Sequence, residues 1–276
     1  MQVLDYLAVA VRAALEAGAA ALEVYEQDFE VEEKADQSPL TLADRRAHDI
    51  ISARLADTGI FLLSEEGRDI AYAERRWWQH LWIVDPLDGT KEFVKKNGEF
   101  TINIALVSAG RPVMGVVFLP VKDRLYFAAH DIGSLRTEGG CINRLQEKTV
   151  LDLVSAAQKL PLTSPGNRPY TIMGSRSHAS AELEAFVAQK RKEHGEVDFI
   201  SAGSSLKFCL VAEGRAHLYP RTGPTMEWDT AAGQAVVEMA GGTVLEYESG
   251  KPLRYNKQDL KNPWFIVSNE GTYEAL

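Results

Sequence analysis

The sequence predicts a layered α/β protein, in which strands and helices alternate along much of the chain. Two short apolar strands, at residues 60–63 and 81–84, each run directly into acidic residues. From about residue 170 onward, strand-like and helix-like patterns follow one another, as in folds whose helices cover the faces of a sheet. The 276 residues, 45% of them hydrophobic, can form the core of one large domain or of two mid-sized ones.

The first half of the chain begins with helical patterns and continues with strands. Apolar residues at helical spacing predict an amphipathic helix over residues 2–25, and alternation predicts a strand at 29–34. A turn at 38–41 leads into a second helix over 43–55, with Thr41 as its N-cap. Beyond the two apolar strands, further strands are expected at 101–107, 113–119 and 125–129, the first two joined by a hairpin at 110–112.

A stretch at residues 152–169 is richer in Pro, Ser and Gly, and it predicts a division into residues 1–155 and 156–276. The second part is expected to contain strands at 170–174 and 197–201 and further strands near the end. Its expected helices cover residues 181–192, 205–213 and 230–240.

Several residues outside these elements are expected to be structural. Trp77, Trp78 and Trp82 are predicted to pack in the interior, and the charged pair Arg75-Arg76 is predicted to be solvated.

Charge and cysteine content exclude some classes of protein. A formal net charge of -9 disfavours a broad nucleic-acid-binding face, which needs a basic field. Cys141 and Cys209 do not form a Cys-x-x-Cys pair, so a thiolate metal site is not expected. The low cysteine content predicts a reducing, cytoplasmic setting. The first 25 residues lack the pattern of a signal peptide, and no apolar run reaches the roughly 18 residues of a membrane span.

Acidic residues occupy three positions from which the backbone can aim them at one site. Glu65 and Asp85 follow the two apolar strands, at the strand ends where ligands bind in open α/β sheets. Pro86 predicts a β-turn that brings Asp85 and Asp88 together, so that both can bind one cation. The same turn leaves the Leu87 carbonyl available and places the Gly89 and Thr90 amides near a phosphate.

This ligand set indicates a metal site for hard cations. Carboxylates and a carbonyl, without nearby Cys or His, favour Mg²⁺ or Mn²⁺ over Zn²⁺. Taken singly, the motifs have simpler explanations: Glu65-Glu66 as a solvated pair, Asp229 as an N-cap, and residues 85–89 as a tight turn. Their occurrence together, in this order, favours a site.

Three motifs resemble those of the lithium-sensitive, Mg²⁺-dependent phosphatases of the inositol monophosphatase superfamily. They are Ser-Glu-Glu at 64–66, Trp-Ile-Val-Asp-Pro-Leu-Asp-Gly-Thr at 82–90 and Glu-Trp-Asp-Thr-Ala-Ala-Gly at 227–233. Within the superfamily the chain is most similar to the 3'(2'),5'-bisphosphate nucleotidases of the CysQ type. The residues that indicate this lie at 91–93, 174–178, 203–209, 211–214, 218–221, 251–253 and 262–263.

The resemblance implies a five-layer α-β-α-β-α sandwich, with an N-terminal metal-binding and a C-terminal substrate-binding subdomain. It also assigns roles to individual residues. Asp44, Glu65 and Thr90 are expected to be catalytic, Thr90 orienting the attacking water with Asp44 as its partner, and Glu66 is expected to support the site. The implied metal ligands are Glu65, Asp85, Leu87, Asp88 and Asp229. The implied substrate contacts are Glu65, Leu87, Asp88, Gly89, Thr90, Ser175, His178, Gly203, Lys207 and Asp229.

The implied activity is removal of the 3'-phosphate from adenosine 3',5'-bisphosphate, with the sulfated analogue as a second substrate and a role in sulfur assimilation. Two or three Mg²⁺ ions, replaceable by Mn²⁺, would act as cofactors, and no nucleic-acid or obligate protein partner is expected. The resemblance also suggests peripheral association with the cytoplasmic face of the inner membrane.

Three alternatives remain open from the sequence. The same mechanism would serve an inositol or sugar phosphate, and a non-catalytic nucleotide- or metal-binding protein would need the same ligands. A haloacid-dehalogenase-like phosphatase is disfavoured, because it requires two aspartates separated by one residue, whereas Asp85 and Asp88 are separated by two.

Overall fold

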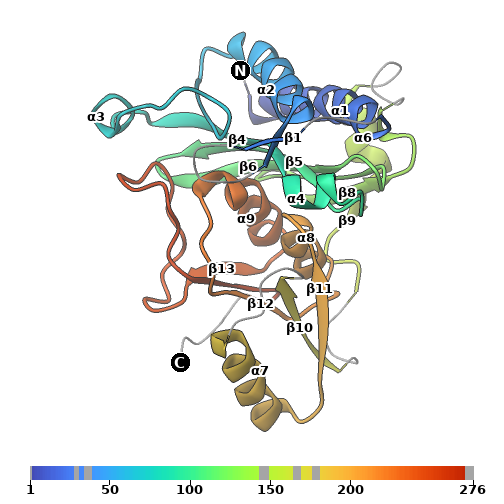
Figure 1. Ribbon diagram of the computed structural model, residues 1–276, viewed down its shortest axis with the longest axis vertical. Helices are drawn as coiled ribbons and strands as arrows, with labels where there is room; N and C mark the ends of the chain where they lie inside the picture. Colours follow the sequence, from blue (N-terminus) through green and yellow to red (C-terminus); the bar gives the residue numbers. More distant parts are fainter. Residues whose placement is uncertain are drawn as a thin grey trace.

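Two β-sheets alternate with three layers of helices along the long axis of the molecule (Figure 1). The computed structural model describes residues 2–27, 31–33, 39–142, 149–163, 169–175 and 181–270. From the top of Figure 1, the order is helices, seven-stranded sheet, helices, five-stranded sheet and helix. The expected five-layer α-β-α-β-α sandwich is therefore confirmed.

The first layer consists mainly of α1 (Val3–Tyr25) and α2 (Leu42–Ala56), which pack on each other. One face of α1 is buried, including Leu7, Val11 and Leu15, and it covers the sheet below. Thr41 caps α2, as the sequence predicts, since its side chain accepts a hydrogen bond from the Ala43 amide at 3.2 Å. The short α6 (Val150–Ala156) also packs against α1, and the hairpin of β1 (Val31–Glu33) and β2 (Pro39–Thr41) precedes α2.

The seven-stranded sheet has the order β3-β4-β5-β6-β7-β8-β9, with β3 and β4 parallel and the other neighbours antiparallel. Its strands are β3 (Phe61–Ser64), β4 (His80–Asp88), β5 (Thr101–Ser108), β6 (Arg111–Leu119), β7 (Arg124–Ala129), β8 (Gly133–Glu138) and β9 (Gln158–Lys159). The strands at the centre are almost wholly buried, because helices cover both faces. The sequence patterns did not predict β8 and β9.

The middle layer lies between the two sheets and carries much of the site. It contains α8 (Leu206–Ala212), the 3₁₀ turn η2 (Glu227–Asp229) and α9 (Ala231–Glu238). Gly115 on β6 allows α9 to approach closely, since a Cβ atom there would lie 2.5 Å from the Ala232 carbonyl oxygen.

The five-stranded sheet has the order β11-β10-β12-β14-β13, and α7 (Ala181–His194) covers its outer face. Its strands are β10 (Tyr170–Ser175), β11 (Val197–Ala202), β12 (Leu218–Arg221), β13 (Thr243–Glu246) and β14 (Phe265–Ser268). The proposed division between residues 155 and 156 stays a prediction; β9, just after it, pairs with the seven-stranded sheet.

Two expectations about side-chain burial are wrong. Trp77 is 71% exposed and lies under the Arg76 guanidinium, 4.6 Å from the ring centroid, whereas Trp82 is fully buried. Arg75, expected to be solvated, is only 2% exposed. Most of its hydrogen-bond partners lie at residues 256–258, far away in the sequence, which is why the local pattern did not reveal its burial.

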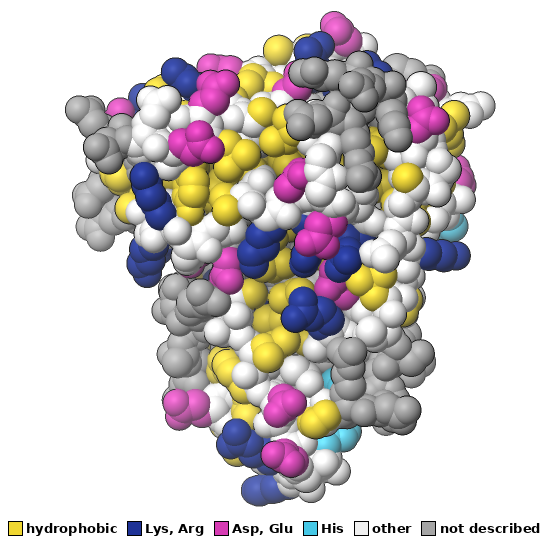
Figure 2. Space-filling view, turned by 90° about the vertical axis from the view of Figure 1, so that its right-hand side faces the viewer, with side chains coloured by type: hydrophobic (Ala, Val, Ile, Leu, Met, Phe, Trp, Pro, Cys, Tyr) yellow, Lys and Arg dark blue, Asp and Glu magenta, His cyan; other side chains and the backbone are white. Residues whose placement is uncertain are grey.

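The molecular surface carries charges of both signs. Figure 2 shows Lys, Arg, Asp and Glu side chains interspersed on one face, with several of them at the level between the two sheets. Among the described helices, none combines the length and the apolar character that crossing a membrane requires.

Candidate active site

Three carboxylates from separate parts of the chain meet at one point. Glu65 follows β3, Asp85 lies on β4 and Asp229 ends η2, and their ligand oxygens lie within 4.8 Å of one another. The Glu65 amide donates to the Val84 carbonyl at 3.1 Å, which extends the pairing of β3 with β4 to the acidic residue itself. The structure thus brings together three of the four predicted metal carboxylates.

The fourth, Asp88, faces a pocket and is held by several donors. Its Oδ2 atom accepts hydrogen bonds from the Ser205 amide at 2.6 Å and from the Asn103 amide group at 3.3 Å. The Ser205 hydroxyl lies 2.9 Å from the same oxygen and 3.0 Å from the Asp229 carbonyl. Asp88 is therefore fixed between β5 and the N-terminus of α8, close to Asp229.

The expected β-turn at Asp85–Asp88 is replaced by a β-bulge. Asp85 pairs with Asn103 and Asp88 with Thr101, so β4 has one more residue than β5 over this interval. The Asp85 carboxylate accepts a hydrogen bond from the Leu87 amide at 3.1 Å. The strand pairing on both sides of Pro86 prevents the chain from turning back, but the bulge still places both carboxylates near one site.

Burial and mutual repulsion make this cluster a poor place for uncompensated negative charge. Burial raises the pKa of Asp85 well above its usual value, and the charges of Glu65, Asp88 and Asp229 raise it further. Asp229 retains some exposed surface, but the protein atoms around its carboxylate desolvate it. That desolvation, with the charge of Asp88, raises the pKa of Asp229 to about 8. A divalent cation bound to these oxygens would stabilise the ionised forms.

The donors present fit Mg²⁺ or Mn²⁺. Closely spaced carboxylate oxygens are hard ligands, and the raised pKa values show a site that a cation would neutralise. Leu87, the expected carbonyl ligand, is buried beside these residues.

Thr90 and Asp44 are hydrogen-bonded, 46 positions apart in the sequence. Thr90 begins α4 (Thr90–Val94), and its Oγ1 donates to Asp44 Oδ1 at 3.2 Å; the Leu87 carbonyl oxygen lies 3.5 Å from the same hydroxyl. Gly89 connects the bulge to Thr90 and has φ +92°. A Cβ atom at Gly89 would lie 3.2 Å from Ser204 Cβ. Glycine is thus favoured at this position both by the left-handed backbone and by the close approach of Ser204.

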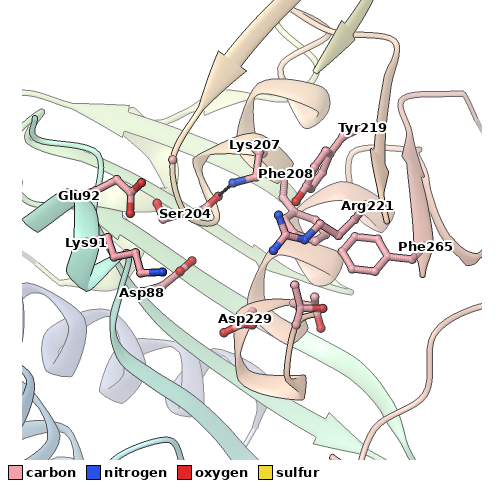
Figure 3. Close-up of a pocket in the computed structure, with 14 residues that line it drawn as sticks. Asp88, Lys91, Glu92, Ser204, Lys207, Phe208, Tyr219, Arg221, Asp229 and Phe265 are labelled. Carbon is pink, nitrogen blue, oxygen red and sulfur yellow. Dashed lines mark hydrogen bonds between the residues drawn. The ribbon is translucent and has the colours of Figure 1, made fainter. Parts of the chain in front are cut away.

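A cavity of about 150 Å³ adjoins the carboxylates, and Figure 3 shows side chains that line it. Asp88 and Asp229 line one side of the cavity, with the Lys91 amino group beside Asp88, and the amino group of Lys207 and the guanidinium of Arg221 line the other. The Glu92 carboxylate also lines the cavity. Lys207 is 6% exposed, and its Nζ atom donates to the Ser204 carbonyl at 2.8 Å. Burial lowers the pKa of Lys207 to about 8, although the Asp88 charge opposes this shift.

Two pocket residues have unused polar atoms. Arg221 Nε and Ser204 Oγ are buried and have no hydrogen-bond partner within the described part of the chain. Buried polar atoms are normally paired, so these two are suited to contact a bound ligand. The sequence analysis gave neither residue a role, although both lie in segments on which the resemblance rests. The position of Arg221 at the end of a strand was the signal that could have indicated a ligand contact.

The remaining predicted substrate contacts are described only in part. Gly203 lines the cavity, and its amide donates to Glu99 Oε2 at 2.8 Å. Ser175 is the last residue of β10, but its side chain and the whole of His178 lie outside what the structure describes. Glu66, next to Glu65, is half-buried, and its supporting role stays a prediction.

Comparisons with known proteins agree with this arrangement. The model of the inositol monophosphatase family matches residues 3–276. The 3'(2'),5'-bisphosphate nucleotidase CysQ of Escherichia coli strain K12 is 44% identical over 257 residues, covering 91% of this chain and 95% of that protein. The protein of the same name from Haemophilus influenzae is 29% identical over 256 residues, covering 91% and 87%.

Solved structures are similar over almost the whole chain. The crystal structure of CysQ from Bacteroides thetaiotaomicron, described as a bacterial member of the inositol monophosphatase family, has 49% identity and a TM-score of 0.90, with 98% of each chain covered. The inositol monophosphatase of Thermotoga maritima has 23% identity and a TM-score of 0.71, covering 97% and 93%, which supports the fold alone.

Proposed function

Because the chain belongs to the inositol monophosphatase family and is a phosphatase, we propose that it removes the 3'-phosphate from adenosine 3',5'-bisphosphate. The products are AMP and inorganic phosphate. The observation that carries this proposal is that Lys207 and Arg221 line the same cavity as the carboxylates Asp88 and Asp229. A substrate with two phosphates can therefore place one phosphate at the cation-binding carboxylates and the other at Lys207 and Arg221.

The substrate assignment draws on the named relatives, on the buried Lys207 and on the half-buried Arg221. A phosphate remote from the reacting one supplies binding energy that orients the reacting phosphate. Lys207 and Arg221 can donate charge-assisted hydrogen bonds to that remote phosphate, and the unused Arg221 Nε and Ser204 Oγ atoms add donors. The sulfated analogue would fit the same contacts, which would connect the enzyme to sulfur assimilation.

The acidic cluster is proposed to bind Mg²⁺, with Mn²⁺ as a substitute, through Glu65, Asp85, Asp88, Asp229 and the Leu87 carbonyl. The bound ions would neutralise phosphate charge and lower the pKa of a water nucleophile. By family resemblance, Li⁺ is expected to inhibit.

The chain's own residues then orient the reaction. Thr90 donates its hydroxyl hydrogen to Asp44 Oδ1, so lone pairs of its oxygen can accept a hydrogen bond from the attacking water. Glu65 provides a carboxylate to hold the same water. The water oxygen bonds to phosphorus as the bond from phosphorus to the 3'-oxygen breaks. The water gives up a proton and the 3'-oxygen takes one up to leave as the ribose hydroxyl, and no protein residue is phosphorylated.

Phosphate release from three substrates tests the proposal. Purified protein with Mg²⁺ is expected to hydrolyse adenosine 3',5'-bisphosphate faster than adenosine 3'-monophosphate, and both faster than inositol 1-phosphate. The bisphosphate should give 5'-AMP as its nucleotide product. Faster release from inositol 1-phosphate would refute the substrate and leave the metal site standing. Undiminished turnover in excess chelator would refute the metal site.

A further inference from the structure

A buried arginine holds the segment between β3 and β4 against the far end of the chain. Arg75 closes α3 (Tyr72–Arg75), ten residues after Glu65. Its Nη1 atom donates to Asn256 Oδ1 at 3.0 Å and to the Lys257 carbonyl at 2.6 Å, and its Nη2 atom donates to the Gln258 carbonyl at 3.1 Å. In return, the Asn256 side-chain amide donates to the Arg75 carbonyl at 2.8 Å. A buried guanidinium needs such partners, because unpaired donors out of water are costly.

The same short segment is held from its other side by a buried acid. Glu227 opens η2, two residues before Asp229, and it is fully buried. Its carboxylate accepts hydrogen bonds from the Asn256 amide at 2.6 Å, the Lys257 amide at 2.9 Å and the Lys257 ammonium at 2.7 Å. Residues 256–258 therefore lie between a buried cation, ten residues after Glu65, and a buried anion, two residues before Asp229.

The backbone at Asn256 is shaped for this double contact. Its φ of +63° is left-handed, a conformation that Asn tolerates better than most residues. Consecutive peptide groups then serve different partners, with amides of 256 and 257 facing Glu227 and carbonyls of 257 and 258 facing Arg75.

The segment that carries Glu65 is also closed on itself. Arg75 Nε donates to the Ile70 carbonyl at 3.3 Å, and Ile70 is buried in the core. The Gly67 amide donates to the Ser64 carbonyl at 3.0 Å, which forms a turn around Glu65. Arg75 thus lies in the same short segment as Glu65, with hydrogen-bonded contacts at Ile70 and at the turn of Ser64 and Gly67 between them.

We propose that Arg75 and Glu227, joined through residues 256–258, form a clamp that sets the spacing between Glu65 and Asp229 and thereby the metal affinity. We call these five residues the Arg75–Glu227 clamp. Glu65 and Asp229 come from opposite halves of the chain, yet their oxygens must stay within 4.8 Å of each other and of Asp85. Arg75 and Glu227 are positioning residues, and the inference rests on the metal site proposed above.

Direct Mn²⁺ binding, followed by electron paramagnetic resonance, tests the clamp without substrate. Arg75→Met removes the donors and keeps most of the side-chain volume, and it is expected to raise the Mn²⁺ dissociation constant by about tenfold. Arg75→Lys should restore part of that loss. Arg76→Met is the matched control, since Arg76 is exposed and stacks on Trp77, and it should leave Mn²⁺ binding unchanged.

A second variant keeps the test decisive if Arg75→Met does not fold. Asn256→Gly preserves the left-handed backbone and removes both side-chain bonds to Arg75. It should also weaken Mn²⁺ binding and raise the Mg²⁺ concentration for half-maximal activity, while kcat at saturating Mg²⁺ stays within about twofold.

The outcomes separate the clamp from the proposed function. Folded variants that bind Mn²⁺ as tightly as wild type, even with a lower Tm, would overturn the clamp, because the contacts would then serve stability alone. A wild-type protein that binds no Mn²⁺ would overturn both the clamp and the metal site. Wild-type binding together with preference for another phosphate ester would leave the clamp intact and refute only the substrate.

Discussion

The Thr90 hydroxyl donates a hydrogen bond to Asp44, whose other carboxylate oxygen caps the helix in which Asp44 lies. Asp44 Oδ1 accepts from Thr90 at 3.2 Å, and Asp44 Oδ2 accepts from the Thr41 amide at 2.8 Å and the Thr41 hydroxyl at 2.6 Å. Asp44 is almost fully buried, so the helix cap fixes its orientation. One carboxylate thus links the first turn of α2 to the residue expected to orient the water.

Thr90→Ala should lower kcat by about 100-fold with little change in KM, because the hydroxyl acts mainly in the transition state. Thr90→Ser keeps the hydroxyl and should retain most activity. Steady-state kinetics at saturating Mg²⁺ distinguish these expectations. A rise in KM alone after Thr90→Ala would assign Thr90 to substrate binding instead.

Without metal, the carboxylate cluster should make stability fall as pH rises. The pKa of Asp229 is about 8 in the folded protein, against about 3.9 for an unfolded aspartate. Asp229 therefore keeps its proton more readily in the folded state than in the unfolded state. The contribution of Asp229 to the free energy of unfolding is present below about pH 4 and is lost as pH rises to about 8.

Thermal unfolding in chelator at several pH values checks this expectation. The Tm of wild type should fall between about pH 5 and 8, and Asp229→Asn should flatten that slope. Saturating Mg²⁺ should raise the Tm most at pH 8, where the ionised ligands are most available. An unchanged slope in Asp229→Asn would place the pH dependence elsewhere.

The close packing of α9 on β6 gives a prediction about the fold. A Cβ atom at Gly115 would lie 2.5 Å from the Ala232 carbonyl oxygen and 2.8 Å from Ala235 Cβ, so Gly115→Ala forces the helix away. The cost is expected to be about 1–3 kcal/mol. Urea unfolding measures the change in the free energy of unfolding. Gly139→Ala is a control that introduces a side chain into open space, and its cost comes from the left-handed φ of Gly139. Because Gly115 does not have a left-handed φ, an undiminished stability of Gly115→Ala would show that α9 accommodates the added methyl group without cost.

Sequence patterns predicted most of the long elements because their signals are local. The cap at Thr41 involves an amide only two positions away, and the buried part of β4 follows from an unbroken apolar run that contains Leu81 and Trp82. The strand β12 was missed because it is short and contains Pro220, which usually argues against a strand between two neighbours.

Motifs and the family resemblance predicted the carboxylates of the site but not the strand pairing that positions them. Glu65, Asp85 and Asp229 meet as expected, but the bulge at Pro86 depends on pairing with β5, which the local turn signal does not contain. The burial of Arg75 depends on partners 181 to 183 positions away, so its neighbours in the sequence gave no sign of it.

Lys207 should distinguish a bisphosphate from a monophosphate. Its ammonium lines the cavity together with the Arg221 guanidinium, and the remote phosphate is proposed to bind there. Lys207→Met should lower kcat/KM for adenosine 3',5'-bisphosphate by roughly 10- to 100-fold, the value of a charged hydrogen bond, and for adenosine 3'-monophosphate by much less. Lys251→Met, at an exposed lysine outside the cavity lining, is the control.

The pH dependence of wild type gives the same prediction a second readout. Because the pKa of Lys207 is about 8, the free enzyme loses this charge as pH rises through that value, and KM for the bisphosphate should rise above about pH 8. The rise should be absent in Lys207→Met and weak for the monophosphate. Equal losses on both substrates after Lys207→Met would instead show that Lys207 serves to hold the Ser204 loop, through its 2.8 Å hydrogen bond, and not to read the second phosphate.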